Sequence, residues 1–435
     1  MKNLIVKLNS HAGFKRYLGN TSWMFAEKIL RIILSIFISI WVARYLGSES
    51  FGLLSYSLSV VGLLTALATL GLDNVVVKEL VKKTHHESTL IGTAFCMKLG
   101  AGFLTYFVLA LACLKVREQD LVYLLLIVGA INIFKSLSVV DCYFQSKVKS
   151  KYVVIATILA VIISNSLKVY FILGDYNVFA FAWAVLIEQV VLALGLLYFY
   201  WTTTGSLNLK SFNFSCAKQL MKSAWPLVLT AFAASLYMKI DQIMIGGLLG
   251  NAQVGQYAVA VRLSEALYFI PIVITSSLFP ALVEAKRKDQ TLYLRRVENL
   301  YRLVVYLALL IALPMSFFSN DIVSVLYGAE YNISGEVFKI HIWASIFIFM
   351  NAAFAKFLYV ECFEKKYLYR TLCGAFMNIA LNYIWIEQYG IIGAAYATLA
   401  SMALMNYCYD IFDPDLRPHL ILKFRCFLPI LPKGV

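Results

Sequence analysis

The chain is long, apolar and basic: it has 435 residues, of which 61% are hydrophobic and 14% charged, and its formal net charge is +14. A soluble domain carries roughly 25% charged residues, so this composition excludes a protein whose whole surface faces water. The basic excess does not indicate nucleic-acid binding, because the Lys and Arg residues are distributed loop by loop as a membrane topology requires.

Apolar segments long enough to cross a hydrocarbon core of roughly 30 Å as helices follow one another along the chain. Six lie in the first half, at residues 23–43, 52–75, 91–114, 121–142, 152–174 and 178–201. Six more lie at residues 224–249, 257–281, 300–318, 338–360, 368–386 and 391–412. The sequence therefore predicts an all-α polytopic membrane protein with about twelve transmembrane helices.

The charges of the loops predict the orientation. Alternate loops, beginning with the N-terminal segment that holds Lys2 and Lys7, carry most of the Lys and Arg residues outside the spans. The opposite loops hold Arg44, Lys115 and Arg117. Because cytoplasmic loops carry the positive charge, both termini are expected in the cytoplasm.

A repeated motif, L-G-x-x-x-x-G, lies at residues 46–52 and again at 249–255, each time between two apolar segments. Residues 175–184 and 388–397 form a second pair of similar segments. A fixed long period indicates duplication, and many transporters place their site between two related halves. We expect two pseudo-symmetric six-helix bundles, at 1–205 and 206–412, followed by a proline-interrupted cytoplasmic tail at 413–435.

Basic side chains occur inside the predicted spans, where a charge costs about 2.5 to 3.5 kcal/mol on insertion scales and usually faces a bundle interior or a wet cavity. Those near a span end can instead reach the headgroups. Acids are fewer in the spans, so we expect a positively charged cavity that suits a phosphate or diphosphate group. The candidate substrate-binding residues are Arg31, Arg262, Lys28, Lys98, Lys135, Lys168 and Lys239.

The acidic residues of the spans are candidates for ion coupling or for counter-ions. Glu27 and Arg31 are spaced i,i+4 and so share one face of the first helix. Arg262 and Glu265 are spaced i,i+3, which fits either an ion pair that locks two helices or the lining of a cavity. The full set of acidic candidates is Glu27, Asp141, Glu188, Asp241 and Glu265.

The eight cysteines and five histidines are scattered and show no C-x-x-C spacing. They predict neither a disulfide framework nor a metal site. We expect packing residues here, with no metal, no cofactor and no catalytic group.

Several segments resemble the Wzx-type polysaccharide flippases, which belong to the multidrug, oligosaccharidyl-lipid and polysaccharide exporter superfamily. The likeness covers nearly the whole chain and is carried by residues 44–52, 70–73, 223–227, 239–246, 255–257 and 389–395. These motifs consist largely of glycines and small residues that pack helices, so they indicate the family rather than one substrate.

The resemblance implies alternating access and the export of an undecaprenyl-diphosphate-linked oligosaccharide, such as an O-antigen unit, across the bacterial inner membrane. It also implies that arginines on the first and eighth helices line the cavity, where Arg31 and Arg262 lie in this chain. The implied partners are the lipid-linked oligosaccharide, membrane lipid, and the polysaccharide polymerase with its chain-length machinery. The implied protein is not an enzyme.

Two other functions stay open. A cation-coupled multidrug or metabolite antiporter of the same superfamily would be expected to have an acidic cavity. A membrane-embedded glycosyltransferase or polymerase would be expected to carry a long extramembrane loop with a D-x-D type motif. Gene deletion distinguishes the antiporter from a flippase, because loss of an antiporter would alter drug sensitivity and leave surface polysaccharide unchanged.

Overall fold

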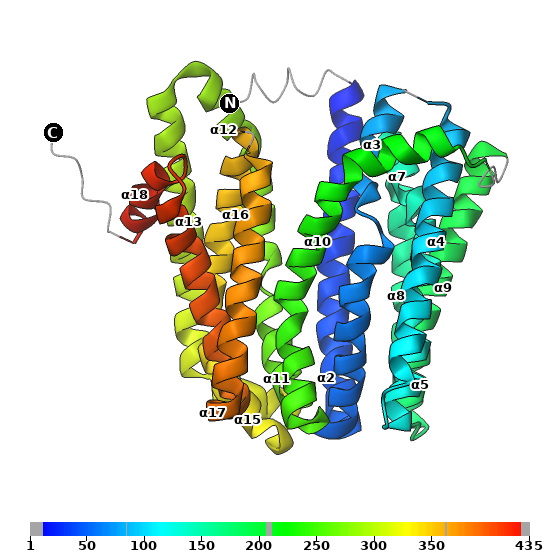
Figure 1. The fold of residues 1–435 in the computed structure, drawn as a ribbon, viewed down its shortest axis with the longest axis vertical. Coiled ribbons are helices and arrows are strands. Elements are labelled where there is room, and N and C mark those ends of the chain that lie inside the picture. The colour runs from blue at the N-terminus through cyan, green and yellow to red at the C-terminus, as the bar shows by residue number, and fades with distance from the viewer. Residues whose placement is uncertain (1–11, 84, 206–210, 362, 428–435) are drawn as a thin grey trace. The chain divides into compact units, whose positions relative to one another are not determined.

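The computed structural model describes residues 12–83, 85–205, 211–361 and 363–427, and these residues form helices and connecting turns without a strand (Figure 1). The predicted cytoplasmic residues Lys2 and Lys7 and the predicted packing residue Cys362 lie outside the described residues, as do residues 428–435 of the predicted tail.

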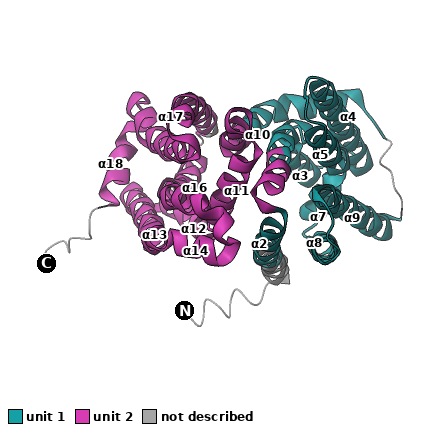
Figure 2. Ribbon diagram, turned by 90° about the horizontal axis from the view of Figure 1, so that it is seen from below, with its two compact units in different colours: residues 1–46, 57–232 teal, residues 47–56, 233–435 magenta. Residues whose placement is uncertain are grey.

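Contacts divide the chain into two compact units, which Figure 2 draws in teal and magenta. Unit 1 consists of the chain up to Leu46 together with Ser57–Phe232, and unit 2 consists of Gly47–Tyr56 together with the chain from Ala233 onward. The boundary thus lies within a helix, and one short segment of the first half belongs to unit 2. The division at residue 205 that the sequence repeat predicts stays a prediction.

The helices of the first half follow the predicted spans closely. They are α2 (Ala12–Ala68), α3 (Leu72–Lys82), α4 (Glu87–Cys113), α5 (Gln119–Gly129), α6 (Ile131–Phe134), the 3-10 helix η1 (Lys135–Ser138), α7 (Val139–Ser146), α8 (Lys151–Leu173) and α9 (Val178–Thr204). Helix α10 (Phe214–Leu249) contains the boundary between the units.

The second half continues with α11 (Asn251–Glu265), α12 (Phe269–Lys288), α13 (Gln290–Phe317), α14 (Ser319–Tyr327), the 3-10 helix η2 (Ala329–Tyr331), α15 (Asn332–His341), α16 (Ala344–Val360), α17 (Glu364–Phe412) and α18 (Arg417–Arg425).

Nine helical segments of the described chain are long and apolar enough to cross a membrane, and some of them, such as Gln119–Ser146 and Asn251–Lys288, join consecutive elements named above. The pair of α15 and α16, bent by 46°, provides a tenth span. Two of the nine each contain two predicted spans, which meet at a non-helical residue, Gly47 in α2 and Gly390 in α17. Counting each of these as two spans yields the predicted twelve. The all-α polytopic class is therefore confirmed.

Some predicted spans are interrupted near their polar residues. The span expected at 121–142 contains the 3-10 helix Lys135–Ser138, and the span expected at 257–281 is broken between Glu265 and Phe269. Non-helical backbone at membrane depth is tolerated where protein or a wet cavity surrounds it. The interruptions are therefore expected to face neighbouring helices or a cavity and not lipid.

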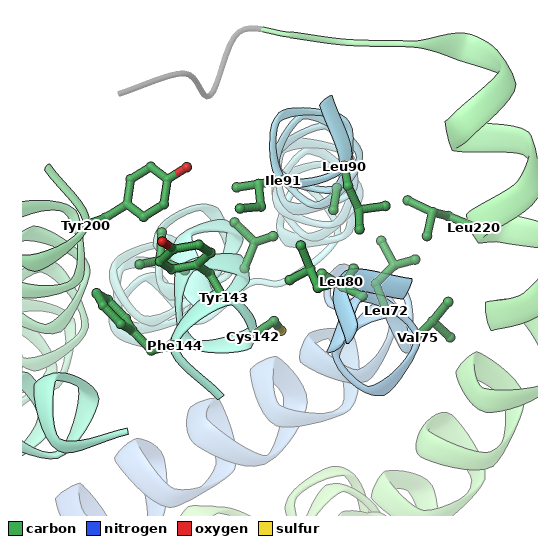
Figure 3. Close-up of a cluster of buried hydrophobic side chains, with 14 of the residues drawn as sticks. Leu72, Val75, Leu80, Leu90, Ile91, Cys142, Tyr143, Phe144, Tyr200 and Leu220 are labelled. Carbon is green, nitrogen blue, oxygen red and sulfur yellow. The ribbon is translucent and has the colours of Figure 1, made fainter. Parts of the chain in front are cut away.

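The core of unit 1 joins apolar side chains from α3, α4, α7, α9 and α10, including Leu72, Leu90, Phe144 and Tyr200 (Figure 3). Cys142 lies among them, 2% exposed, and its Sγ contacts an Asp73 carboxylate oxygen at 3.5 Å. The described residues include no group of three or more His, Cys, Asp or Glu side chains arranged to hold a metal ion.

The two copies of L-G-x-x-x-x-G pack against each other in unit 2. The first glycine of each copy has a positive φ, 71° at Gly47 and 91° at Gly250. Glycine adopts such a φ without steric cost. The second glycines make the close contact: a Cβ on Gly52 would lie 1.8 Å from the Asn251 carbonyl oxygen, and one on Gly255 would lie 2.0 Å from the Ser48 carbonyl oxygen. The duplicated motif is thus a reciprocal helix crossing that only glycine permits.

Replacing Gly52 with alanine is expected to destabilise the protein by about 1 to 3 kcal/mol, because the added Cβ overlaps backbone atoms that cannot rotate away. Thermal unfolding in detergent measures the effect. Gly62→Ala on the same helix is the matched control, since a Cβ added there would have no atom within 4 Å, and alanine should preserve or raise stability at that position. Equal unfolding temperatures for the two variants would contradict the crossing.

Candidate functional site

The first charged group of the spans lies on α2 in unit 1. The Arg31 Nε lies 3.3 Å from a Glu27 carboxylate oxygen, as the i,i+4 spacing predicts. The Arg31 side chain is 51% exposed, whereas that of Glu27 is 11% exposed, and Lys28 is exposed beside them. The acid is covered while the guanidinium stays accessible, within a helix that is apolar enough to span a membrane.

A second group surrounds Asp73 of α3. The Lys98 side chain, 1% exposed, bonds to the Asp73 carboxylate, and its Nζ also donates to the Ser138 Oγ at 2.8 Å. The same two charges act electrostatically on Lys135 in η1 and on Asp141 in α7. The structure thus brings together three predicted residues, Lys98, Lys135 and Asp141, around an acid that was not among the predicted site residues.

Lys168 and Glu188 form a pair between α8 and α9 in unit 1. The Lys168 Nζ lies 3.8 Å from a Glu188 carboxylate oxygen. The partner of this lysine is therefore a predicted acid of the neighbouring helix. This arrangement fits a counter-ion role for Glu188.

In unit 2, Arg262 and Glu265 are electrostatic neighbours, and each has a further partner of its own. The Glu265 carboxylate lies 3.6 Å from the Lys239 Nζ. The Arg262 guanidinium carbon lies 4.6 Å from the centre of the Phe51 ring, and Tyr327 and Tyr331 are also electrostatic neighbours of this arginine. Arg262 is thus seated on an aromatic face and borders the helix crossing formed by the duplicated motif.

Asp241 of α10 is the centre of a buried polar cluster in unit 2. One carboxylate oxygen accepts hydrogen bonds from Thr398 and from the Tyr257 hydroxyl, the latter at 2.6 Å. The other accepts from the Asn382 Nδ2 at 2.6 Å, and the same amide nitrogen lies 3.2 Å from the Asn378 Oδ1. All three donors to the carboxylate are neutral. None of the ion pairs within the described part of the chain involves Asp241.

A small cavity lies beside this cluster. Its volume is about 20 Å³, and Asp241, Tyr257, Glu265, His341 and Thr398 are among its lining residues. That volume is enough for one water molecule or one small ion. The cavity therefore brings two predicted acids, Asp241 and Glu265, to the same space.

A buried ionic network lies near the end of α17. The Arg370 Nε is 3.4 Å from an Asp410 carboxylate oxygen, and Lys423 of α18 bonds to the other oxygen. Arg370 also donates to the Asn351 Oδ1 at 2.8 Å and to the Asn406 Oδ1. The three charged side chains are fully buried, although the hydropathy pattern predicts a cytoplasmic loop near Arg370.

Sequence reasoning missed most of the residues that complete these clusters. Asn378, Asn382 and Thr398 are neutral, so a search for charges does not find them. Asn378 and Asn382 are, however, spaced i,i+4 on an apolar helix, and polar residues repeated on one helical face are a detectable signal. Asp73 was detectable as an acid within a predicted span.

The succession of long apolar helices defines a multi-pass membrane protein, and its fold is similar to that of a solved lipid flippase. The structure is similar to "Lipid II flippase MurJ, inward closed conformation", with a TM-score of 0.73 and 15% identity over 92% of this chain and 90% of that one. The sequence profile described as "Polysaccharide biosynthesis protein" matches residues 41–335. The chain belongs to this family of Wzx-type polysaccharide flippases, which confirms the resemblance.

Two relatives with names of the same kind are similar to this chain in sequence. A "Putative O-antigen transporter" of Shigella dysenteriae is 22% identical over 333 residues, which are 75% of this chain and 80% of the relative. A "Probable low-salt glycan biosynthesis flippase" of Haloferax volcanii is 25% identical over 203 residues, or 46% of this chain. The second match spans 42% of the archaeal relative's length.

Proposed function

We propose that the protein is a flippase that moves undecaprenyl-diphosphate-linked oligosaccharide units, of an O-antigen or a similar surface polysaccharide, from the cytoplasmic to the periplasmic leaflet of a bacterial inner membrane. The observation that carries the proposal is the accessible Arg31 guanidinium, with Lys28 beside it, inside a membrane-spanning helix. Family membership and the names of the relatives support it.

In this proposal the diphosphate is the group that the cations recognise. An arginine presents planar donors that bind two phosphate oxygens at once, whereas a lysine acts as a point charge. Arg31 is the primary contact, Lys28 adds charge beside it, and Arg262 with Lys239 serves the substrate from unit 2. Lys98, Lys135 and Lys168 have acidic neighbours and contribute positive charge to the interior.

Transport by alternating access requires no covalent bond to form or break, so the protein is not proposed as an enzyme. The prenyl chain stays in the lipid while the charged head crosses. The translocated unit is then available to the polysaccharide polymerase and its chain-length machinery, which are the proposed functional partners.

A reconstituted system tests the proposal. Purified protein in vesicles, supplied with an undecaprenyl-diphosphate-linked oligosaccharide in both leaflets, should let a membrane-impermeant glycosidase digest nearly all of the oligosaccharide. Protein-free vesicles should retain the inner-leaflet half. Retention of that half with protein present would contradict a flippase, and uptake of a cationic dye by the same vesicles would favour the multidrug antiporter.

We further propose that Asp241 is the site that couples transport to a cation. A buried carboxylate held by neutral donors is costly when charged, so it either takes up a proton or holds a small cation. The Asn382 Oδ1 is buried and has no hydrogen-bond partner within the described chain, and it offers a further oxygen ligand near the carboxylate. Monovalent cations and protons suit such a set of oxygen atoms better than transition metals do.

Replacing Asp241 with asparagine is expected to reduce the stimulation of flipping by an ion gradient about tenfold or more, because the neutral amide takes up no proton and binds a cation more weakly than a carboxylate does. Exchange without a gradient should continue. Flipping in vesicles with an imposed sodium or proton gradient measures both. Glu188→Gln is the control, since that acid is paired with Lys168, and gradient stimulation that survives in Asp241→Asn would contradict the coupling role.

A further inference from the structure

Helix α18 buries a lysine and exposes apolar side chains, the opposite of the usual arrangement at a surface that faces water. Lys423 is fully buried, bonded to Asp410 and 3.6 Å from the centre of the Phe354 ring. Ile421 and Phe424 in the helix and Phe427 just after it are 56%, 59% and 40% exposed. Lysine is almost never fully buried unless paired, whereas phenylalanine and isoleucine usually are buried. The outward face of α18 is therefore suited to an apolar environment.

The position of α18 is close to the end of a helix that is apolar enough to span a membrane. The helix α17 ends at Phe412, and four residues connect it to Arg417, a link that can span at most about 18 Å. The Lys366 Nζ bonds to Asp413 and Asp415 and holds this link against the start of α17. In Figure 1, α18 lies across the end of α17 and does not extend it.

Three exposed charges beside this apolar face are positive, and the exposed acid nearby, Asp415, is paired with Lys366. Arg417 and Arg425, at the two ends of α18, are both exposed, and Lys365 is exposed at the beginning of α17. Outward apolar side chains flanked by arginines suit the membrane interface, where the apolar groups contact acyl chains and the basic residues attract anionic headgroups. We propose that α18 is an in-plane membrane helix that binds anionic phospholipid, with Ile421, Phe424 and Phe427 at the headgroup and acyl-chain boundary.

The inward face of α18 connects this lipid contact to the core of unit 2. Leu416 and Cys426 are buried in the cluster that joins α12, α13 and α16, and the Lys423 Nζ donates to the Asn406 carbonyl oxygen at 3.1 Å. Lipid bound by α18 therefore stabilises the ends of α13, α16 and α17 together. The inference does not depend on which substrate the protein transports.

Photocrosslinking of the full chain tests the proposal. The protein is placed in nanodiscs of phosphatidylcholine, or of phosphatidylcholine mixed with phosphatidylglycerol, and carries p-benzoylphenylalanine at one position. Phe424→p-benzoylphenylalanine should form lipid adducts, several-fold more in the anionic discs. Leu420, on the buried face of the same helix, is the negative control and should crosslink within the protein. Leu310 on α13, an exposed apolar position of a spanning helix, is the positive control for folding and should form lipid adducts in both discs.

The charges are tested in the same assay. Adding Arg417→Gln and Arg425→Gln to the Phe424 variant should remove the several-fold gain in anionic discs and leave the adducts in phosphatidylcholine. An absence of lipid adducts at position 424, with Leu310 still reactive, would show that α18 faces water and would overturn the proposal. Equal yields in the two discs before the arginines are changed would overturn its anionic-lipid part.

Discussion

Replacing Arg31 with alanine is expected to slow translocation of the lipid-linked oligosaccharide strongly while leaving the amount of protein in the membrane unchanged. The guanidinium is accessible within a spanning helix, and each hydrogen bond to a charged group is worth about 1.5 to 3 kcal/mol. Losing one such contact slows transport roughly tenfold to a hundredfold. The glycosidase-access assay in vesicles measures the rate.

Two further variants separate recognition from general charge. Arg31→Lys keeps the positive charge but lacks the planar pair of donors, so its rate should lie between those of the alanine variant and the unchanged protein. Lys339→Ala removes a half-exposed lysine that is paired with Glu336 at 4.0 Å and should leave the rate unchanged. An Arg31→Ala protein that flips normally would remove this residue from the site.

Replacing Asp410 with asparagine is expected to lower the free energy of unfolding by about 3 to 5 kcal/mol. The change leaves Arg370 and Lys423 buried side by side without the carboxylate that both contact. The amide preserves the shape of the side chain, so the loss comes from uncompensated charge and not from a cavity. Chemical or thermal unfolding in detergent measures the difference.

The same variant should show a distinctive dependence on pH. Burial and the neighbouring Arg370 lower the pKa of Lys423 to about 7 in the folded protein, and Asp410 opposes this shift. With a folded pKa below the unfolded one, the unfolded state binds more protons, so stability rises with pH. Without Asp410, which raises it, the pKa of Lys423 falls below the value of about 7 in the unchanged protein. The cost of Asp410→Asn should therefore shrink as the pH rises toward about 7, where Lys423 of the variant has already lost its proton, and stay level above it.

Glu284→Gln is the control for Asp410→Asn, because Glu284 forms an exposed pair with Lys288. Exposed pairs contribute little, so this variant should unfold like the unchanged protein. Similar stability for the Glu284 and Asp410 variants at every pH would show that the buried network does not hold α18 in place.

The spans were predictable because each segment is apolar over its whole length, and a helix is the structure that satisfies its backbone in lipid. Their interruptions were not. The 3-10 turn at Lys135–Ser138 contains neither proline nor glycine, so no helix-breaking residue marks it. The break after Glu265 precedes Pro271, in the first turn of α12, where proline is tolerated, but proline alone does not distinguish a break from a kink. The interruptions depend on tertiary contacts, such as the hydrogen bond from Lys98 to Ser138.

The charged residues of the site could be listed from the sequence, whereas their partners could not. The spacing of Glu27 and Arg31 predicts their contact because both lie on one helix. Lys239 with Glu265, and Asp241 with Asn382, join residues from different helices. Those contacts depend on how the helices pack, and no local pattern in a single sequence encodes that packing. Neutral residues such as Asn382 are also missed by a search for charged residues.

Deletion of the gene in its host, with surface polysaccharide and the leaflet location of the undecaprenyl-diphosphate-linked oligosaccharide followed together, tests the proposed function most directly. A flippase predicts loss of the surface polysaccharide and accumulation of the lipid-linked unit on the cytoplasmic side, both reversed by the unchanged gene and much less by the Arg31→Ala gene. Unchanged polysaccharide with altered drug sensitivity would contradict the flippase and favour the antiporter.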